Sequence, residues 1–376
     1  MWLYLRYFGT HLLIALTMLG LVLGGAASWL GMAAGALGWI GLDALSGRAA
    51  QAPRFRHPWV LDLALHSFLP SVAALTLVFL WYLAPGDLLG LGAWLESHLD
   101  YPVLARHASK DWLDYEGAIV SFGLAVALGG ILTAHELMHR TQDRLAMFTA
   151  RWLLAISFNA TLEVAHVFGH HRDVGTPQDP ATARRGENVY AFYLRSSLGQ
   201  VAQAWRIEAR RLAGRPALGR LLLENKVTRG FLRSFSVAAG FAILSGPLGL
   251  TVFLLASLYN KLLLEALNYL EHYGLVRDAA TPYALRHAWD TDRAFSHVVL
   301  IHLPMHSEHH LDPRTHFEDL HPRVDETPIL PCGYLAALAV TLIPPLWFRL
   351  MRASLADWDQ RFATAEERAL LGQPEI

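Results

Sequence analysis

The sequence predicts an all-α, polytopic membrane protein with six transmembrane helices and a cytoplasmic helical cap that holds a histidine-rich dimetal site. Composition is the first reason: 53% of the 376 residues are hydrophobic and 17% are charged, whereas soluble domains carry about 25% charged residues. Long apolar runs broken by glycine and proline are the second, and three short clusters of histidine are the third. We expect a single membrane-embedded domain over residues 1–376.

The first apolar run, residues 10–42, is longer than the roughly 20 residues that one helix needs to cross a bilayer. The Gly24-Gly25 pair offers a bend, so the run predicts two helices that form a hairpin. No small-residue cleavage site closes a short apolar core after Arg6. We therefore expect a retained helix and not a cleaved signal peptide.

Further apolar runs predict the remaining helices in order. A third helix is expected over 60–83, before Pro85-Gly86, and a fourth over about 115–139, which runs into the first histidine cluster. Residues 232–246 and 248–270 predict a fifth and a sixth, separated at Gly246-Pro247. Accordingly, we expect three helices and a periplasmic loop in 1–114, a catalytic region in 115–350 and a cytoplasmic tail in 351–376.

Charge predicts the orientation and narrows the class of partner. Residues 181–233 contain eleven Lys and Arg residues, so the positive-inside rule places this segment and the histidine clusters on the cytoplasmic side of an inner membrane. The formal net charge of −1 gives no reason to expect a nucleic-acid partner. The one cysteine, Cys332, excludes an internal disulfide framework, an all-cysteine zinc site and a fused rubredoxin module.

The three histidine clusters have spacings typical of metal ligands. His135 and His139 are one helical turn apart in "HELMH". "HVFGHH" follows at 166–171, and "HLPMHSEHH" at 302–310. On a helix, adjacent histidines point about 100° apart and can serve two metals.

Each cluster also has a simpler interpretation. HExxH is the motif of zinc proteases, in which Glu136 would be the general base, and any single histidine can be an inert core or surface residue. Together, however, the clusters offer more imidazoles than one ion can bind, which predicts two metals. Imidazole suits iron, zinc, copper and nickel, so the residues alone leave the metal open.

His272 is a further candidate ligand, in "NYLEHYG" at 268–274. It continues a polar stripe of Lys261, Glu265 and Asn268 along an otherwise apolar helix. One interpretation is a Lys261–Glu265 ion pair at the membrane interface. The other is a stripe that faces the metal site, because ionisable groups at membrane depth usually face partners or a cavity.

Four stretches, "HELMHR", "HVFGHHRDVGTPQDPATARRGE", "NYLEHYGL" and "HLPMHSEHH", closely resemble the integral-membrane alkane monooxygenases of the membrane desaturase/hydroxylase superfamily. The resemblance spans about 115–350. It implies six transmembrane helices and a non-haem diiron centre bound almost wholly by histidine. The ligands it implies are His135, His139, His166, His170, His171, His272, His306, His309 and His310. His302 also matches a family histidine, and we expect it beside the ligands.

The resemblance implies the reaction too: oxygen-dependent terminal hydroxylation of medium-chain n-alkanes to primary alcohols. Electrons would come from rubredoxin and an NAD(P)H-dependent rubredoxin reductase, and the hydrophobic substrate would enter from the membrane lipid. The alternatives are a xylene-type aromatic-methyl hydroxylase, a fatty-acid hydroxylase or desaturase, and an intramembrane zinc protease. The basic tract 181–233, which includes Arg206, Arg210 and Arg211, would dock the acidic carrier, or would simply reflect membrane topology.

Two departures from the family pattern bear on the pocket. Ala165 stands where the family usually has glutamate, with Glu163 two residues earlier, and Met138 replaces a residue that is often small. Carboxylates can orient metal-bound imidazoles through their second nitrogen. The candidates for this role are Glu136, Glu271, Glu308 and Asp290, and beyond these Asp173, Asp179 and Asp292. The sequence singles out no substrate-binding residue.

Overall fold

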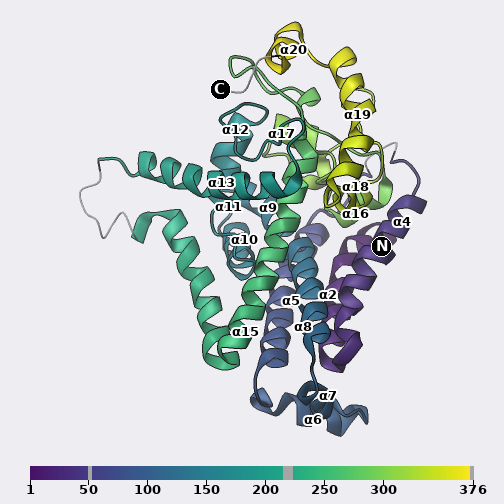
Figure 1. Ribbon diagram of the computed structural model, residues 1–376, viewed down its shortest axis with the longest axis vertical. Coiled ribbons are helices and arrows are strands. Elements are labelled where there is room, and N and C mark those ends of the chain that lie inside the picture. The colour runs from purple at the N-terminus through teal and green to yellow at the C-terminus, as the bar shows by residue number, and fades with distance from the viewer. Residues whose placement is uncertain (50–52, 215–222, 373–376) are drawn as a thin grey trace. The chain divides into compact units, whose positions relative to one another are not determined.

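The computed structural model describes residues 1–49, 53–214 and 223–372. Within these ranges the protein is helical: it has no strand, only the isolated β-bridges Arg48–Arg293 and Asp290–Ile329. Figure 1 shows the helices in chain order from purple to yellow. The all-α prediction is confirmed for the described residues.

The chain folds into two compact units, each assembled from separate stretches. The first consists of Met1–Trp39, Trp59–Ala160 and Thr228–Lys261, and the second of Ile40–Pro58, Thr161–Val227 and Leu262–Ile376. The first unit contains most of the apolar helices. The second contains most of the histidines.

In the first unit, the N-terminal apolar run forms the predicted hairpin. The first arm comprises α1 (Trp2–Leu5), a 3-10 turn and α2 (Gly9–Leu23). Gly24 then adopts φ +65°, a conformation that glycine reaches without strain. The second arm comprises a 3-10 segment, α3 (Leu30–Met32) and a π-helical segment (Ala33–Trp39). The arms pack closely because a Cβ on Gly31 would lie only 2.2 Å from Thr17 Oγ1.

The next helices of this unit follow the predicted boundaries. α5 spans Trp59–Leu83, and the connection after it contains α6 (Leu91–Leu99) and α7 (Val103–Ala108). α8 (Trp112–Val126) begins at a capping box between Asp111 and Asp114. A π-turn (Ala127–Ile131) leads into α9 (Leu132–His139), and α10 (Arg144–Ile156) follows.

The last predicted pair of helices is one bent element, α15 (Lys226–His272). It breaks at Gly246, which has φ +68° and precedes Pro247, and Figure 1 shows its two arms as a V. The rings of Phe241 and Phe253 stack across the bend at 4.2 Å. Five segments of the described chain are long and apolar enough to cross a bilayer: Trp2–Leu23, Gly25–Leu45, Trp59–Leu83, Trp112–His139 and Lys226–His272. The chain is therefore a multi-pass membrane protein.

The second unit contains the C-terminal end of α15, the long helix α13 and several short helices. They are α4 (Ile40–Leu45), α11 (Leu162–Ala165), α12 (His171–Asp173), α13 (Val189–Arg211), α16 (Ala294–Val299), α17 (His306–Leu311) and α18 (Tyr334–Thr341). Residues 351–372, expected as a tail, complete α19 (Pro344–Arg361) and form α20 (Ala365–Leu371). They belong to the core, since Trp358 and Glu367 are buried.

Asp43 of α4 fixes the start of α16 in this unit. Its Oδ1 accepts hydrogen bonds from the Ser296 backbone N (3.0 Å) and the Ser296 Oγ (2.6 Å). Its other oxygen faces Gly333, where an added Cβ would lie 2.0 Å away. Gly333 has φ −60°, so its role is to leave space and not to provide an unusual backbone conformation.

Gly333→Ala is therefore expected to lower the free energy of unfolding by about 1–3 kcal/mol, as overpacking of a filled interior does. Thermal unfolding of the purified protein measures it. Gly41→Ala in α4 is the matched control, because nothing lies within 4 Å of a Cβ added there. Equal unfolding temperatures for the two variants would contradict the close fit at Asp43.

Candidate metal centre

The second histidine cluster is carried by a π-turn. α11 leads directly into a π-helical segment, His166–His170, and the chain then continues as α12. Such turns are rare and often occur at functional sites. Gly169 lets α13 approach this turn, because an added Cβ would lie 2.4 Å from Gln203 Oε1.

Four histidines of the second unit form a compact, buried group. They come from the π-turn, the end of α15 and α17, and their ligand nitrogens all lie within 4.8 Å of one another: His170, His272, His306 and His310. The Nε2 atom of His306 is 3.1 Å from that of His272 and 3.0 Å from that of His310. We refer to these four as the buried histidine group.

Hydrogen bonds to the second ring nitrogen orient two of these imidazoles. His170 Nδ1 is 2.8 Å from Asp179 Oδ2, and His272 Nδ1 is 2.9 Å from the carbonyl oxygen of His287. When Nδ1 carries the donated proton, Nε2 keeps a lone pair that points into the group. This is the arrangement by which proteins set the tautomer of metal-binding histidines.

The carboxylate of Glu271 lies beside His306. Its Oε2 lies 3.4 Å from His306 Nε2, and its Oε1 accepts a hydrogen bond from the hydroxyl of Tyr334. All three side chains are buried. The tyrosine therefore holds the carboxylate in place against the histidine group.

The buried histidine group fits a metal ion better than a hydrogen-bond network. His170 Nε2 is buried and has no hydrogen-bond partner among the described residues, an arrangement that is costly without a ligand. Imidazole nitrogens about 2.1 Å from one ion lie roughly 3.0–3.4 Å apart. The two short nitrogen–nitrogen distances in the group match that spacing.

Burial and charge set the protonation of these rings. Burial alone would lower the pKa of His170, but the charge and hydrogen bond of Asp179 raise it above the usual value, and the pKa of Asp179 is lowered in turn. Burial together with the neighbouring imidazoles holds the pKa of His310 well below its usual value. His310 is thus neutral at pH 7, as a metal ligand must be.

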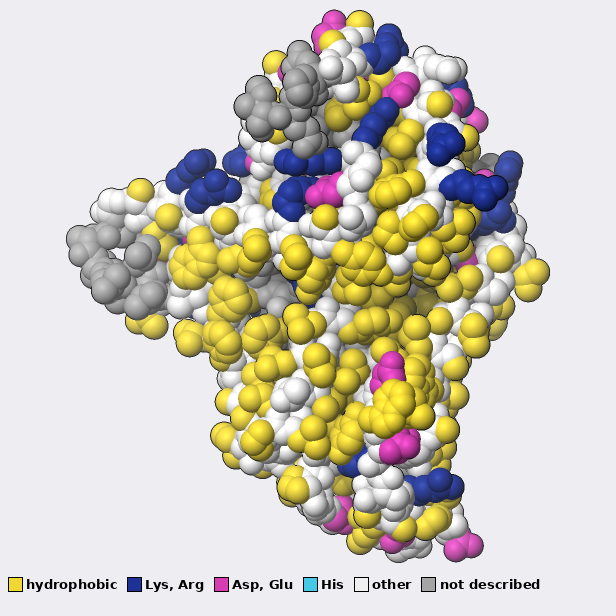
Figure 2. All heavy atoms as spheres, viewed as in Figure 1, with side chains coloured by type: hydrophobic (Ala, Val, Ile, Leu, Met, Phe, Trp, Pro, Cys, Tyr) yellow, Lys and Arg dark blue, Asp and Glu magenta, His cyan; other side chains and the backbone are white. Residues whose placement is uncertain are grey.

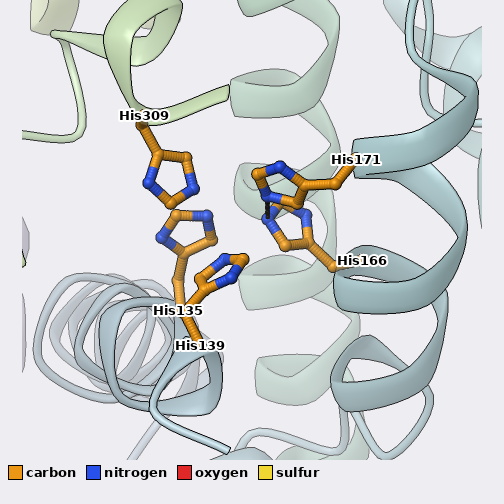
Figure 3. A group of neighbouring side chains, drawn as sticks. All are labelled: His135, His139, His166, His171 and His309. Carbon is orange, nitrogen blue, oxygen red and sulfur yellow. Dashed lines mark hydrogen bonds between the residues drawn. The ribbon is translucent and has the colours of Figure 1, made fainter. Parts of the chain in front are cut away.

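A second group of histidines includes His171 and His309, the sequence neighbours of His170 and His310. The ligand nitrogens of His166, His171 and His309 lie within 4.8 Å of one another, and Figure 3 shows their rings facing a common centre. His166 Nε2 and His171 Nε2 are 3.0 Å apart. Each adjacent pair of histidines, 170–171 and 309–310, is divided between the two groups. The rings of His171 and His310 stack at 4.2 Å, so the groups are neighbours.

The first histidine cluster belongs to the other unit. His135 and His139 lie one turn apart at the end of α9, with ring centroids 5.2 Å apart. The carboxylate of Glu136 pairs with Arg140 at 2.9 Å, and Arg140 also bonds Asp62 at 2.6 Å. These contacts fix the last turn of α9.

Comparison with known proteins agrees with this site. Residues 110–327, more than half of the chain, match the family model described as "Fatty acid desaturase". The chain belongs to the fatty acid desaturase family. The matched segment contains all ten histidines singled out in the sequence.

The curated relatives of this desaturase-family chain are named as monooxygenases. Alkane 1-monooxygenase 1 of Pseudomonas aeruginosa is 36% identical over 64% of the chain and 63% of its own length. Alkane 1-monooxygenase 2 of the same organism is 34% identical over 66% of the chain and 67% of its own length. The hydroxylase component of xylene/toluene monooxygenase from Pseudomonas putida is 35% identical over 69% of each. The chain thus matches just under two thirds of the first relative and slightly more of the other two.

Several residues predicted to lie beside the ligands have other partners in this desaturase-family chain. His302 is buried, but its Nδ1 bonds the carbonyl of Phe317 at 2.6 Å and it belongs to neither group. Glu308 pairs with Arg323 at 3.3 Å. Asp290 accepts bonds from the backbone N and hydroxyl of Ser307, which fix the first turn of α17. Burial raises the pKa of Asp290 to about 7.

The two departures from the expected pattern lie in the interior. Ala165 and Met138 are buried. Glu163 is 3.6 Å from Lys226 Nζ, so the nearest carboxylate to the expected position contacts a lysine. Asp179 is one of the seven carboxylates that the sequence suggests for orienting an imidazole, and it hydrogen-bonds His170 of the buried group.

The C-terminal helix α20 supports the buried histidine group through one intermediate. Glu367 Oε1 accepts a bond from His287 Nε2 at 2.7 Å and pairs with Arg286 at 3.0 Å, and the His287 carbonyl holds His272. Burial keeps the pKa of His287 low, at about 4, despite the carboxylate, so His287 donates as the neutral ring. Sequence reasoning missed this connection because Glu367 lies outside every motif.

We expect Glu367→Ala to lower the free energy of unfolding by about 1–3 kcal/mol, because the buried donor on His287 loses its acceptor. Metal affinity should fall as well, since the loop that orients His272 is loosened. Thermal unfolding and metal titration measure the two effects. Glu366→Ala, at the exposed neighbouring position, is the control; if the two variants behave alike, α20 does not support the site.

Proposed function

We propose that this protein catalyses oxygen-dependent terminal hydroxylation of medium-chain n-alkanes to primary alcohols at a histidine-bound diiron centre. The observation that carries the proposal is the pair of adjacent histidine groups, divided at 170–171 and 309–310. Two neighbouring groups of nitrogen ligands suit two ions. The alkane 1-monooxygenases among the relatives support the choice of reaction.

The proposed ligands are the nine histidines of the three clusters and α15. His166, His171 and His309 would hold one ion, and His170, His272, His306 and His310 the other. The spacing of His135 and His139 supports them as further ligands. Iron suits an all-imidazole donor set and supplies the redox chemistry with oxygen that breaking an unactivated C–H bond requires, whereas zinc has no accessible redox change.

The chain's own residues would exclude water from the centre and hold the imidazoles in a fixed orientation. The four residues of the buried histidine group are at most 4% exposed, and Asp179, the His287 carbonyl and Glu271 would fix their orientation. A buried site excludes water from reactive species. A hydrocarbon dissolved in the bilayer would then reach it without passing through water.

The proposed topology has six crossings, with the two arms of α15 counted separately, and the catalytic side in the cytoplasm of a cell with an inner membrane. The 47 residues of α15 extend over about 70 Å at 1.5 Å per residue, roughly twice the hydrocarbon thickness. The basic tract supports the orientation. Two of its residues, Arg215 and Arg220, lie outside the described residues.

The electrons would come from a separate carrier. One cysteine, Cys332, cannot form an iron–sulfur site of its own. We propose rubredoxin as the donor, reduced by an NAD(P)H-dependent rubredoxin reductase.

A second candidate is hydroxylation of an aromatic methyl group, which the xylene/toluene relative favours. The family description also leaves fatty-acyl oxidation as a third. All three would use the same centre and differ in the substrate channel.

The test is metal analysis and product analysis of the purified protein in lipid nanodiscs with rubredoxin, its reductase and NADH. We expect two irons per chain and 1-octanol from octane, at a higher rate than methyl hydroxylation of xylene or oxidation of an acyl lipid. Chelation of the iron should abolish turnover, and adding back Fe²⁺ but not Zn²⁺ should restore it. One zinc per chain with proteolytic activity would refute the proposal.

A further inference from the structure

An exposed apolar stripe runs along α13, a helix of 23 residues in the second unit. Leu194 and Leu198 are 62% and 72% exposed, and Trp205 is 39% exposed. The spacing of three and four residues places them on one face, together with Tyr190 and the smaller side chains of Ala191, Ala202 and Ala209. Exposed side chains along the centre of this stripe are all apolar.

The opposite face of α13 is fixed in the protein, so the stripe points outward. Gln200 is buried and bonds Glu265 of α15 at 2.8 Å. Phe192 packs edge-on against Tyr269 with centroids 5.4 Å apart. A continuous apolar surface of this kind usually marks contact with a partner or a membrane.

Arginines border one side of the stripe. Arg206 and Arg210 are exposed and one turn apart, and neither side chain forms an ion pair or hydrogen bond with a described residue. They line a cavity of about 370 Å³ with Arg172, Asp173, Pro177, Gln178, Gln203 and Ile207. In Figure 2, Lys and Arg side chains gather along one edge of α13 and hydrophobic side chains along the other.

The cavity carries a net positive charge. Its one carboxylate, Asp173, is paired by Arg172 through bonds of 2.8 and 2.6 Å. Arg206 and Arg210 are left to attract an anion. Guanidinium groups bind phosphate oxygens through paired, charge-assisted hydrogen bonds.

We propose that α13 lies in the plane of the membrane interface, with its apolar stripe among the acyl chains, and that Arg206 and Arg210 bind the phosphate of an anionic phospholipid in the adjoining cavity. A helix with one apolar face and a basic border has the composition of interfacial helices. Arginine stems pack along apolar surface while the charged ends reach the headgroups. Each basic group near an anionic leaflet strengthens the attachment.

An acidic protein is the competing occupant of the same arginines, and the stripe argues against it. Arg206 and Arg210 lie in the C-terminal half of α13, whereas the stripe begins at Tyr190 and runs along nearly the whole helix. A helix of 23 residues is about 35 Å long. A carrier bound at the arginines would leave the leucines in water, while a bilayer covers both. Arg211 is not part of the site, since it pairs with Glu208 at 2.7 Å.

The first test measures the depth of α13 in nanodiscs of phosphatidylcholine mixed with phosphatidylglycerol. In a Cys332→Ser background, a spin label at Leu198→Cys should collide with dissolved oxygen more than with a water-soluble nickel chelate. A label at Gln360→Cys, an exposed polar position of α19, should show the reverse. If the label at 198 stays accessible to nickel until rubredoxin is added, the stripe is a protein-docking surface and the proposal is wrong.

The second test measures lipid retention by native mass spectrometry after extraction from the same mixture. Arg206→Ala with Arg210→Ala should retain phosphatidylglycerol about tenfold less than the unaltered protein, because two charge-assisted contacts are lost. Arg352→Ala removes an exposed charge from α19 and should change nothing. Equal retention in both variants would overturn the headgroup site. So would displacement of the lipid by equimolar inorganic phosphate, because a free anion would then be the ligand.

Discussion

Under the proposed function, replacing His310 with alanine is expected to abolish alkane hydroxylation and to release metal from the buried histidine group. His310 is buried, and its ring lies 4.2–5.1 Å from those of His171, His306, His170 and His272. Alanine leaves three imidazoles and a polar cavity. Loss of a hydrogen-bond partner to a ligand costs about 10–100-fold in metal affinity or activity, and loss of a ligand should cost more. Iron content per chain and octane turnover measure the effect.

His316→Ala is the matched control for this experiment, since His316 lies six residues later on the exposed surface. It should keep full iron content and turnover. Circular dichroism separates loss of metal from loss of fold. Full iron content and octane turnover in His310→Ala would mean that His310 is not a metal ligand, and that the assignment of an ion to the buried histidine group is wrong.

The apolar helices were predictable because their signals are local. A span of about 20 apolar residues is a property of consecutive positions, and Gly24 and Gly246 mark breaks that the structure contains. The number of membrane crossings was harder to predict, because α15 continues through its bend as one helical element. Hydropathy cannot tell whether such a bent element crosses once or twice.

The ligands were predictable as residue types, but their partners were not. His170 and His310 belong to clusters with recognisable spacing. The groups that orient the imidazoles have no such pattern: Asp179 lies in a loop, and the His287 carbonyl is a backbone atom that any residue would supply. Glu367, which hydrogen-bonds His287, lies 80 residues after it in the chain. Only folding brings these groups together.

Two of the carboxylates predicted to orient metal-bound imidazoles, Glu136 and Glu308, form ion pairs with arginines. Glu136 pairs with Arg140, four residues later and directly after the end of α9, a spacing at which opposite charges attract. That arginine is visible in "HELMHR", and the pair lies in the interior, since both side chains are at most 10% exposed. Glu308 pairs with Arg323, fifteen residues away in the chain, and no sequence rule identifies that contact.

Asp179→Asn is expected to lower metal affinity and hydroxylation by about 10–100-fold. The carboxylate accepts from His170 Nδ1 at 2.8 Å, the Thr182 hydroxyl at 2.7 Å and the Ala181 backbone N at 3.1 Å. If the oxygen of asparagine stays with Ala181, its amide donates toward His170 Nδ1. The ring proton then moves to Nε2, the nitrogen that faces the buried histidine group, and that nitrogen can no longer bind a metal.

Asp173→Asn is the matched control, six residues earlier in the same segment. Asp173 pairs with Arg172 and contacts Gln203, but it does not touch an imidazole of either group, so metal binding should be unchanged. The ring-nitrogen NMR shifts of the metal-free protein report which nitrogen of His170 carries the proton in each variant. A wild-type Nδ1–H tautomer in Asp179→Asn, together with weakened metal binding, would assign Asp179 an electrostatic role, because its charge and not its proton acceptance would then stabilise the bound ion.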